Sequence, residues 1–394
     1  MAVIKISQLP PASEVTPDDM IIFMDNGVTK RFYAKQIGSS TITVTPSGSL
    51  ASPTDHTNIQ NAINALPSGG RIFLQAGNYY LSNTINISKP NIEMVGAGRS
   101  TQLNCVGNYG NVFKCELPYV PTTAVSGMNG LKFESMRFES TVPRTSGAAI
   151  YAAYTHQATF RDLHICDTTY GRTYGTPNFE PSEGGPGNLY YDGIDIDDPV
   201  AVAQVALAVP TPIPFYNGIE ILGQDQINID RIVCCASNKG IFIQGSNYVN
   251  ADFSYDGVIS KCHLWGIMTG SGVGIHLGPG VGGFLVDYCS LNAWGTGIFA
   301  TAIGTTQGGG IVTIRDGFAE GCTIGYKTLN MQNTVVNNLW ANIYASGSSQ
   351  HRLHIMGTMQ SHNIEIAGAL KALVVAISGS YNTTGNTSNF TKIG

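Results

Sequence analysis

A motif of glycine followed by alternating apolar residues recurs through the middle of the chain and limits its possible folds more than any other feature. A second apolar motif, which ends in cysteine, recurs with it. Matched positions lie about 22 to 30 residues apart, the length of one solenoid turn made of three short strands. One turn alone leaves its apolar face open, so the sequence predicts turns stacked into a parallel coil. The first motif begins at Gly193, Gly218, Gly240, Gly274 and Gly297, and the second spans residues 160–166, 229–234, 258–262 and 284–289.

The composition agrees with a β-rich chain. Only 12% of the 394 residues are charged, 43% are hydrophobic and 47 are glycine. Such a chain, rich in Val, Ile, Thr, Asn and Ser, favours strands joined by tight turns. The net charge of -5 without a basic run predicts no nucleic-acid partner. No apolar stretch is long enough to predict a membrane span, so no membrane insertion is expected.

The cysteines and the first residues indicate where the protein is made. None of the eight cysteines forms a CxxC pair, and none has zinc-ligand spacing with histidine. We therefore expect free, buried thiols, no metal and no cofactor, as suits a reducing cytosol. The stretch from Met1 to Lys5 lacks the apolar segment of a secretory signal. Export by another route, such as lysis, is expected.

Residues 1–40 are expected to form a separate small unit. An apolar run from Met20 to Met24 is followed by a turn at Asp25-Asn26-Gly27 and a second arm from Val28 to Tyr33. Asn-Gly between two such runs is a strong hairpin signal. About forty residues cannot bury enough surface to be stable alone. This unit should therefore dock on its neighbours in an oligomer or on a larger assembly.

Residues 41–100 predict one short helix followed by closely spaced strands. Thr54 or Asp55 would cap a helix over residues 55–66, whose apolar residues have helical spacing. Strands are expected at residues 71–74, 80–81, 84–87 and 92–95. The helix would cover the first turn of the coil, whose strand edge is otherwise unpaired. The apolar positions of the helix are Ile59, Ala62, Ile63 and Leu66.

Two stretches resemble known proteins. Ile6-Ser7-Gln8-Leu9-Pro10, Asp18-Asp19-Met20-Ile21 and residues 25–30 are similar to a short N-terminal virion-attachment module of phage tail spikes and tail fibres. The helix, then the sequence from Gly69 to Tyr79 and Met94-Val95-Gly96-Ala97-Gly98, resembles the start of pectate-lyase-like β-helices, phage tail spikes among them. The first similarity covers about a tenth of the chain.

The resemblance implies an all-β fold, a right-handed single-stranded parallel β-helix after a small N-terminal β module. It divides the chain into the attachment module (1–40), the β-helix (41–350, with the capping helix at 55–66 and an inserted loop at about 169–192) and a β-rich C-terminal end (351–394). It further implies a homotrimer in the virion tail, assembled in the host cytoplasm. Its partners would be other tail or baseplate proteins and a host cell-surface polysaccharide.

Acidic residues at outward positions are the candidate catalytic groups. Side chains alternate along a strand, so Asp195 and Asp197 would face out between Ile194 and Ile196, and Glu220 takes the slot that matches Asp195 one turn later. Direct neighbours would bring the carboxyls within about 5 Å, as in retaining glycosidases, and an intervening turn would give about 10 Å. The alternative is that these carboxylates are simply solvated.

Aromatic residues are the candidate glycan-binding groups, because sugars stack on flat apolar rings. Tyr174, Tyr190 and Tyr191 lie in the Pro- and Gly-rich loop at about 169–192, and loops of that length are uncommon unless they bind something. Trp265 and Trp294 are separated in sequence by about one turn and are expected to be neighbours on successive turns. The alternative for both tryptophans is packing in the core or at a trimer interface.

The sequence leaves three functions open. The first is a tail adhesin that binds a surface polysaccharide without cutting it, and the second is a glycan depolymerase, hydrolase or lyase, on the same tail protein. The third is a free carbohydrate-active enzyme. The Gly-His-Gly turn and the Arg-x-Lys pair of galacturonan hydrolases do not occur, and no arginine matches the lyase pattern beside Asp192, Asp195, Asp197 and Asp198. These absences favour the adhesin.

Overall fold

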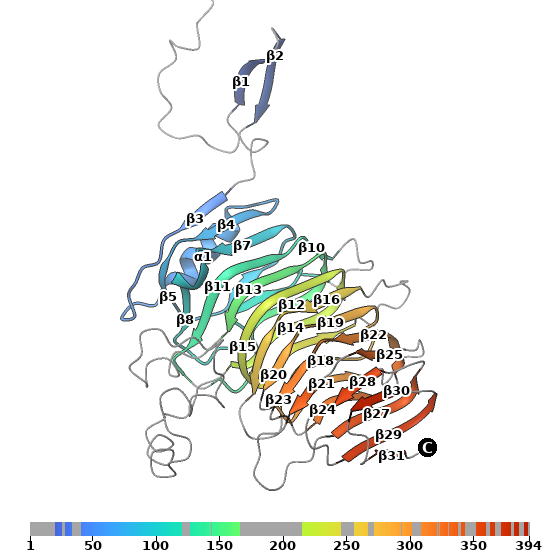
Figure 1. The fold of residues 1–394 in the computed structure, drawn as a ribbon. Coiled ribbons are helices and arrows are strands. Elements are labelled where there is room, and N and C mark those ends of the chain that lie inside the picture. The colour runs from blue at the N-terminus through green and yellow to red at the C-terminus, as the bar shows by residue number, and fades with distance from the viewer. Residues whose placement is uncertain are drawn as a thin grey trace, which may run out of the picture.

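The computed structural model shows a mostly β protein with one α-helix and a long parallel sheet that curls round on itself (Figure 1). Most of its strands fall into three columns, and within a column each strand is hydrogen-bonded to the next. The residues that the structure describes are 20–25, 28–33, 41–119, 127–142, 144–165, 215–245, 256–266, 272–292, 294–301, 309–320, 322, 324–329, 331–337, 340–342, 352–359, 363–366, 372–379, 382–385 and 390–392.

Three strands belong to more than one column: β11 and β13 take part in the first and second columns, and β15 takes part in all three. The first column is β3 (Thr41–Val44), β4 (Gly70–Leu74), β7 (Ile92–Gly96), β11 (Lys132–Ser140), β13 (Thr159–Ile165), β15 (Ile227–Gln244), β16 (Gly257–Ser260), β19 (Phe284–Asp287), β22 (Gly309–Arg315) and β25 (Met331–Asn337). The second is β5 (Gly77–Leu81), β8 (Thr101–Cys105), β11, β13, β15, β17 (His263–Gly266), β20 (Ser290–Asn292), β23 (Phe318–Glu320) and β26 (Trp340–Asn342). The third is β6 (Ile85–Ile87), β9 (Phe113–Cys115), β12 (Ala148–His156), β14 (Phe215–Asp225), β15, β18 (Val273–Leu277), β21 (Thr296–Thr301), β24 (Ile324–Leu329), β27 (Arg352–Met359), β29 (Ala372–Gly379) and β31 (Phe390–Lys392).

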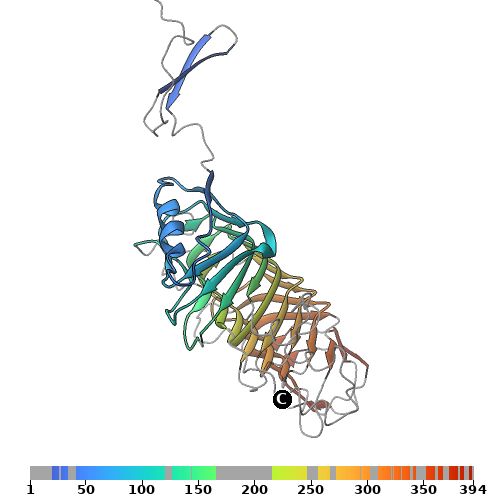
Figure 2. The ribbon, with the colours of Figure 1, turned by 90° about the vertical axis from the view of Figure 1, so that its left-hand side faces the viewer.

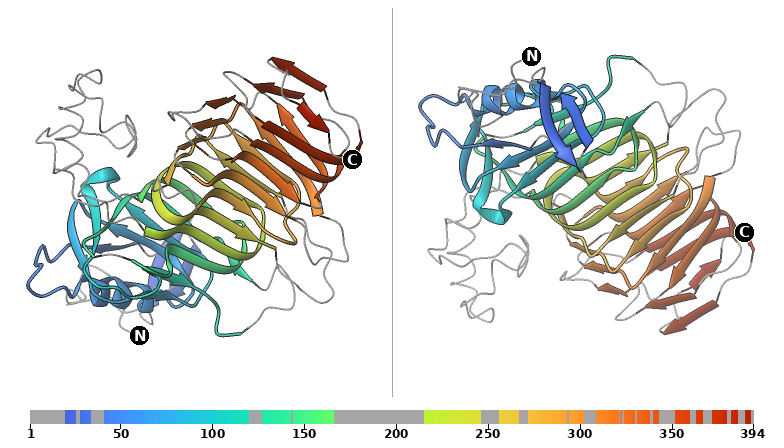
Figure 3. Two further views of the ribbon diagram at one scale, coloured as in Figure 1. Left: turned by 90° about the horizontal axis from the view of Figure 1, so that it is seen from below. Right: turned by 90° about the horizontal axis from the view of Figure 1, so that it is seen from above.

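The remaining elements are few. Strands β1 (Met20–Asp25) and β2 (Val28–Tyr33) pair antiparallel with each other, which confirms the predicted hairpin arms. Strand β10 (Met128–Asn129) pairs with β12, and β28 (Asn363–Ile366) pairs with β30 (Asn382–Gly385). The 3-10 helix η3 (Gly98–Ser100) precedes β8. Figure 3 shows the strands of the sheet running side by side from its N-terminal to its C-terminal end.

The predicted short helix is present as α1 (Asp55–Asn64), and it lies against the N-terminal end of the sheet (Figure 2). Ile59, Ala62 and Ile63 are its buried apolar residues. The predicted side-chain cap is absent: Thr54 forms no capping hydrogen bond. The Asp55 carboxylate instead accepts hydrogen bonds from the backbone and hydroxyl of Ser47 and from the backbone N–H of Tyr80. The buried carboxylate therefore ties the helix to β5.

The pairing register measures the length of each turn along the first column. The partners Arg71 and Glu93 are 22 residues apart, and the corresponding spacing is 27 from Glu134 to Arg161 and 30 from Asp230 to Ser260. These spacings confirm the predicted repeat. The step from β13 to β15 is much longer because it includes residues 166–214, where the sequence also loses its rhythm.

The inward side chains form one continuous hydrophobic core from Val44 to Tyr326. Rings from successive strands stack inside it: the centroids of Phe133 and Phe160 are 6.0 Å apart, with nearly parallel planes. The seven cysteines that the structure describes are buried, as predicted, and Cys166 lies outside the described residues. Burying such side chains stabilises each turn by roughly 1.5 to 3 kcal/mol per large residue.

Glycine at one position of the third column explains the first sequence motif. A Cβ on Gly218, Gly240, Gly274 or Gly297 would lie 2.4 to 2.7 Å from the carbonyl oxygen of the next glycine in the stack, which ends at Gly325. Any side chain there would push neighbouring turns apart. The stacked glycines, named the glycine ladder below, let the backbones of neighbouring turns approach closely.

A second stacked position uses residues other than glycine. Six residues between the first and second columns have φ between +51° and +58°, a left-handed conformation that only a few per cent of such residues adopt. The register places them directly above one another on six successive turns. The same sharp bend therefore repeats at this corner. These residues are Ser135, Asp162, Arg231, Lys261, Tyr288 and Asp316.

Candidate functional site

Glu220, a predicted catalytic residue, lies near one end of an outward-facing row on the third column. The register places Tyr151 of β12 beside it on one side and Phe242 of β15 on the other. The same position continues through His276, Phe299 and Lys327. We name these six side chains the aromatic row: Tyr151, Glu220, Phe242, His276, Phe299 and Lys327.

The two positions beside Glu220 on the described sheet are occupied by Tyr151 of β12 and Phe242 of β15. Tyr151 comes before residues 166–214, so the spacing of the sequence repeat did not identify it as a neighbour of Glu220. Asp195 and Asp197 themselves lie outside the described residues.

Polar side chains surround Glu220. The Asn217 amide donates a hydrogen bond of 2.8 Å to Glu220 Oε2, and the Asn238 amide donates one of 2.9 Å to Asn217 Oδ1. Burial, together with the charges of Glu116 and Glu220, raises the pKa of Tyr151 to about 12, so its hydroxyl stays protonated at neutral pH. This end of the row thus offers amide, hydroxyl and carboxylate groups, the types that hydrogen-bond sugar hydroxyls.

Aromatic rings occupy the middle of the row. The His276 ring centroid lies 4.9 Å from that of Phe242 and 4.9 Å from that of Phe299. Both imidazole nitrogens are buried, and neither has a hydrogen-bond partner in the part of the chain that the structure describes. Burial, and secondarily the charge of Lys239, lowers the pKa of His276 to about 4. The imidazole is therefore neutral at physiological pH.

A lysine lies over a ring at each end of this stack. Lys239 Nζ is 3.4 Å from the Phe242 ring centroid, and Lys327 Nζ is 5.0 Å from that of Phe299. Burial lowers the pKa of Lys239, and the charge of Glu220 opposes that shift. Each ammonium group is thus held by a cation–π contact, a favourable interaction at such distances.

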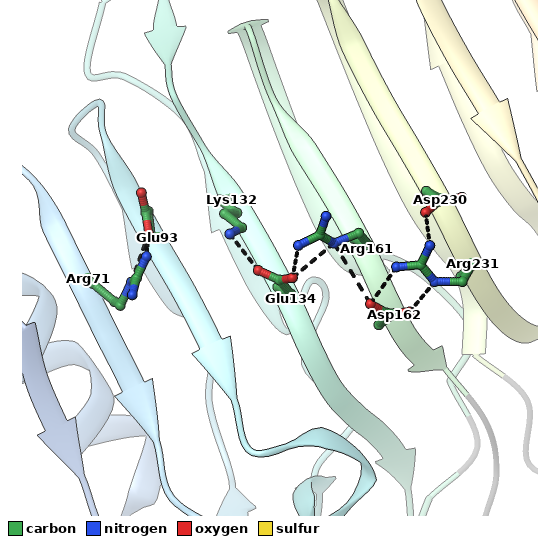
Figure 4. A network of polar contacts seen from close by, with 8 residues as sticks. All are labelled: Arg71, Glu93, Lys132, Glu134, Arg161, Asp162, Asp230 and Arg231. Carbon is green, nitrogen blue, oxygen red and sulfur yellow. Dashed lines mark hydrogen bonds and ion pairs between the residues drawn. The ribbon is translucent and has the colours of Figure 1, made fainter.

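The outer face of the first column is different, because its charges pair with one another (Figure 4). Lys132 and Arg161 both contact Glu134, and Arg231 contacts both Asp162 and Asp230. Arg71 pairs with Glu93 farther along the same face. Because these charged side chains pair with one another, they need no charged ligand to compensate them.

The predicted glycan-binding tryptophans are buried. Trp294 is 1% exposed and belongs to the core, where its indole Nε1 donates a 3.0 Å hydrogen bond to the Leu264 carbonyl. This burial favours the packing alternative for Trp294. Trp265 is 3% exposed and packs with Val233 and Cys235.

The two tryptophans are also not stacked on successive turns, because the register neighbour of Trp265 is Asn292. Their separation in sequence could not show which face of the strand each indole takes. Tyr174, Tyr190 and Tyr191 lie outside the described residues, so their predicted role is unchanged.

Two kinds of site are absent from the described part of the chain. No group of three or more His, Cys, Asp or Glu residues there is placed to hold a metal ion. None of its helices has the length and apolar character needed to cross a bilayer.

Comparison with known proteins adds little. No protein-family model matches the chain, and no curated protein sequence matches it. A solved structure described as ORF18 of Geobacillus virus E2 aligns with 95% of this chain and 69% of its own, at 12% identity and a TM-score of 0.35. A likeness of this size carries no argument about fold or function.

Proposed function

We propose that this chain is a phage tail spike or tail fibre protein that binds a host surface polysaccharide during adsorption. In this proposal the curled sheet closes into a right-handed β-helix, three copies form a homotrimer, and the hairpin of β1 and β2 attaches to other tail or baseplate proteins. The resemblance of the first forty residues to a virion-attachment module supports the tail assignment.

The observation that carries the binding proposal is the aromatic row. It combines hydrogen-bonding groups at Tyr151 and Glu220 with the partly exposed ring of Phe299 on one outward face. Sugars are bound by this combination, because their hydroxyls need polar partners while their C–H faces pack on rings. The strands hold these groups at a fixed spacing of about 4.8 Å per turn.

The depolymerase alternative gains no support from the residues that neighbour Glu220 on the sheet. A glycosidase of the usual type needs two carboxyl groups flanking the bond that it cuts. The residues beside Glu220 on the neighbouring strands are Tyr151 and Phe242. Binding without cleavage therefore remains the better proposal for this face.

An array of bacterial capsular polysaccharides and lipopolysaccharides tests the proposal. The purified full chain should bind at least one glycan, and the isosteric pair Tyr151→Phe with Glu220→Gln should weaken that binding by about tenfold, the loss of one or two hydrogen bonds. Glu93→Gln on the first column is the matched control and should bind normally. Absence of binding across the array, or full binding by the double variant, would overturn the proposal.

The same samples separate adhesin from depolymerase, and a second assay tests the location. New reducing ends or unsaturated sugars after incubation with a bound glycan would show that the protein is a depolymerase and not an adhesin. Antibody labelling of phage particles should place the protein on the tail. Labelling only of lysate protein would remove the virion role.

A further inference from the structure

Lys239 and Lys327, the two lysines that lie over rings of the aromatic row, differ from Lys114 and Lys132 on the surface of the sheet. Lys114, on the same outward position of β9, pairs with Glu116 at 2.7 Å, and Lys132 on β11 pairs with Glu134. In the described part of the chain, Lys239 forms no ion pair, although its side chain is half-buried. Lys327 likewise contacts a ring and forms no ion pair with a described residue. Lys239 and Lys327 therefore lack the carboxylate partner that Lys114 and Lys132 have.

A half-buried ammonium group without a carboxylate partner is unfavourable. Removing it from water weakens its hydration, and the usual compensation is an opposite charge within ion-pair distance. Glu220 is close enough to affect Lys239 electrostatically, yet its Oε2 accepts its hydrogen bond from Asn217. An anionic group supplied by a ligand would provide the missing compensation.

The rest of the row fits a ligand with spaced charges. His276 stands between the two lysine-bearing ends and is neutral, so it adds no third charge. Three register steps separate Phe242 from Lys327, which is about 14 Å at about 4.8 Å per step. An extended polymer lying along the column would meet a cation, an apolar middle and a second cation.

We propose, building on the polysaccharide-binding function above, that the ligand of the aromatic row is an acidic polysaccharide whose anionic groups are bound by Lys239 and Lys327. The anion is either a sugar carboxylate or a phosphate diester, which present the same charged oxygens to an ammonium group. The sugar rings between them pack along His276 and Phe299, whose side chains are partly exposed.

The test compares charged and neutral glycans on one array that carries neutral, uronic-acid-containing and phosphate-containing bacterial polysaccharides. Bound glycans should be acidic, and binding should weaken as NaCl is raised because screening reduces the attraction. Lys239→Gln should weaken binding by at least about tenfold and Lys327→Gln by a smaller factor, as expected when one member of a charged contact is removed. Carboxyl reduction of a bound uronic-acid polymer should abolish its binding, whereas a bound phosphate polymer should be unaffected by that treatment.

Lys132→Gln is the matched control, since it removes a lysine that is already paired with Glu134 on the first column, away from the aromatic row, and it should change binding by less than about twofold. Thermal unfolding of each variant checks that it is folded. Selective binding of neutral glycans, or acidic binding that survives Lys239→Gln in a folded protein, overturns this inference but leaves polysaccharide binding intact. Failure to bind every glycan on the array removes the polysaccharide function itself, and the inference with it.

Discussion

His276 and Phe299 lie on neighbouring strands with their ring centroids 4.9 Å apart and their planes 17° apart, and Phe242 covers the other side of the imidazole. Stacking buries the imidazole without giving its nitrogens a partner in the described structure. The charged imidazolium is therefore disfavoured in the folded state.

We expect acid to destabilise the protein through this residue. Burial lowers the folded-state pKa of His276 to about 4, below the unfolded value of about 6.5. The unfolded chain thus binds the proton first, and stability falls as the pH drops from about 6.5 to 4, by up to about 3 kcal/mol. Urea unfolding at pH 7, 5 and 4 measures this loss.

His276→Phe keeps the ring stack and removes the titration, so its stability should depend less on pH over the same range. His164 adds a parallel effect, because burial and the charges of Arg99 and Arg137 also lower its pKa to about 4. Equal slopes for His276→Phe and wild type would contradict the prediction.

Arg144 is predicted to hold the connection between β8 and β9. Its side chain is buried, donates hydrogen bonds to the carbonyls of Gly107, Tyr109 and Gly110, and lies over the rings of Tyr109 and Phe215. Arg144→Met should cost roughly 3 kcal/mol or more, because it leaves these carbonyls without a donor. Arg71→Gln, which removes an exposed pair, should cost under about 1 kcal/mol. Comparable losses in denaturant titrations of the two variants would refute the role of Arg144.

The glycine ladder predicts a position-specific effect of adding one methyl group. Gly274→Ala would place a Cβ 2.7 Å from the Gly297 carbonyl oxygen, so the turns must shift, at a cost of about 2 kcal/mol or more. Gly110→Ala meets no atom within 4 Å and should be tolerated. Thermal unfolding midpoints of the two variants measure the difference, and a normal midpoint for Gly274→Ala would argue against close stacking.

The ion pair between Asp162 and Arg231 is predicted to be modest in strength. Arg231 Nη2 donates a 2.8 Å hydrogen bond to Asp162 Oδ2, and this bond lowers the pKa of Asp162. Both side chains are substantially exposed, so a double-mutant cycle with Asp162→Asn and Arg231→Gln should give about 0.5 to 1 kcal/mol of coupling. The coupling should shrink in roughly 0.5 M NaCl. A coupling free energy above about 2 kcal/mol would show that this face is less solvated than the structure indicates.

The coil was predictable because its signals are local and repeated. Glycine followed by isoleucine at Gly218, Gly240, Gly274 and Gly297 marks the stacked bend, and the helical spacing around Ile59 marks the single helix. These features arise from backbone geometry and burial, which act in the same way at every turn.

The candidate site was only partly predictable, because it depends on register across unequal turns. Glu220 was identified by its outward position, but its neighbour Tyr151 comes from a strand without the glycine motif, on the far side of residues 166–214. The stacking of Phe242 on His276 was not predictable either, because an unusually long turn separates the two residues and the strands must be aligned across it. The inward direction of Trp294 could not be predicted for the same reason, because a shift of the strand register by one residue exchanges the inward and outward faces.

The spacing within the glycine ladder varies while the stacking stays regular, since the chain from Gly240 to Gly274 is longer than the chain from Gly218 to Gly240. The connecting segments absorb all of this variation. Such an architecture separates two kinds of evolutionary change: segments between turns can lengthen or be exchanged, while the array of outward side chains keeps its alignment. A chain with this property can acquire a new loop between two turns without rebuilding the surface beside it.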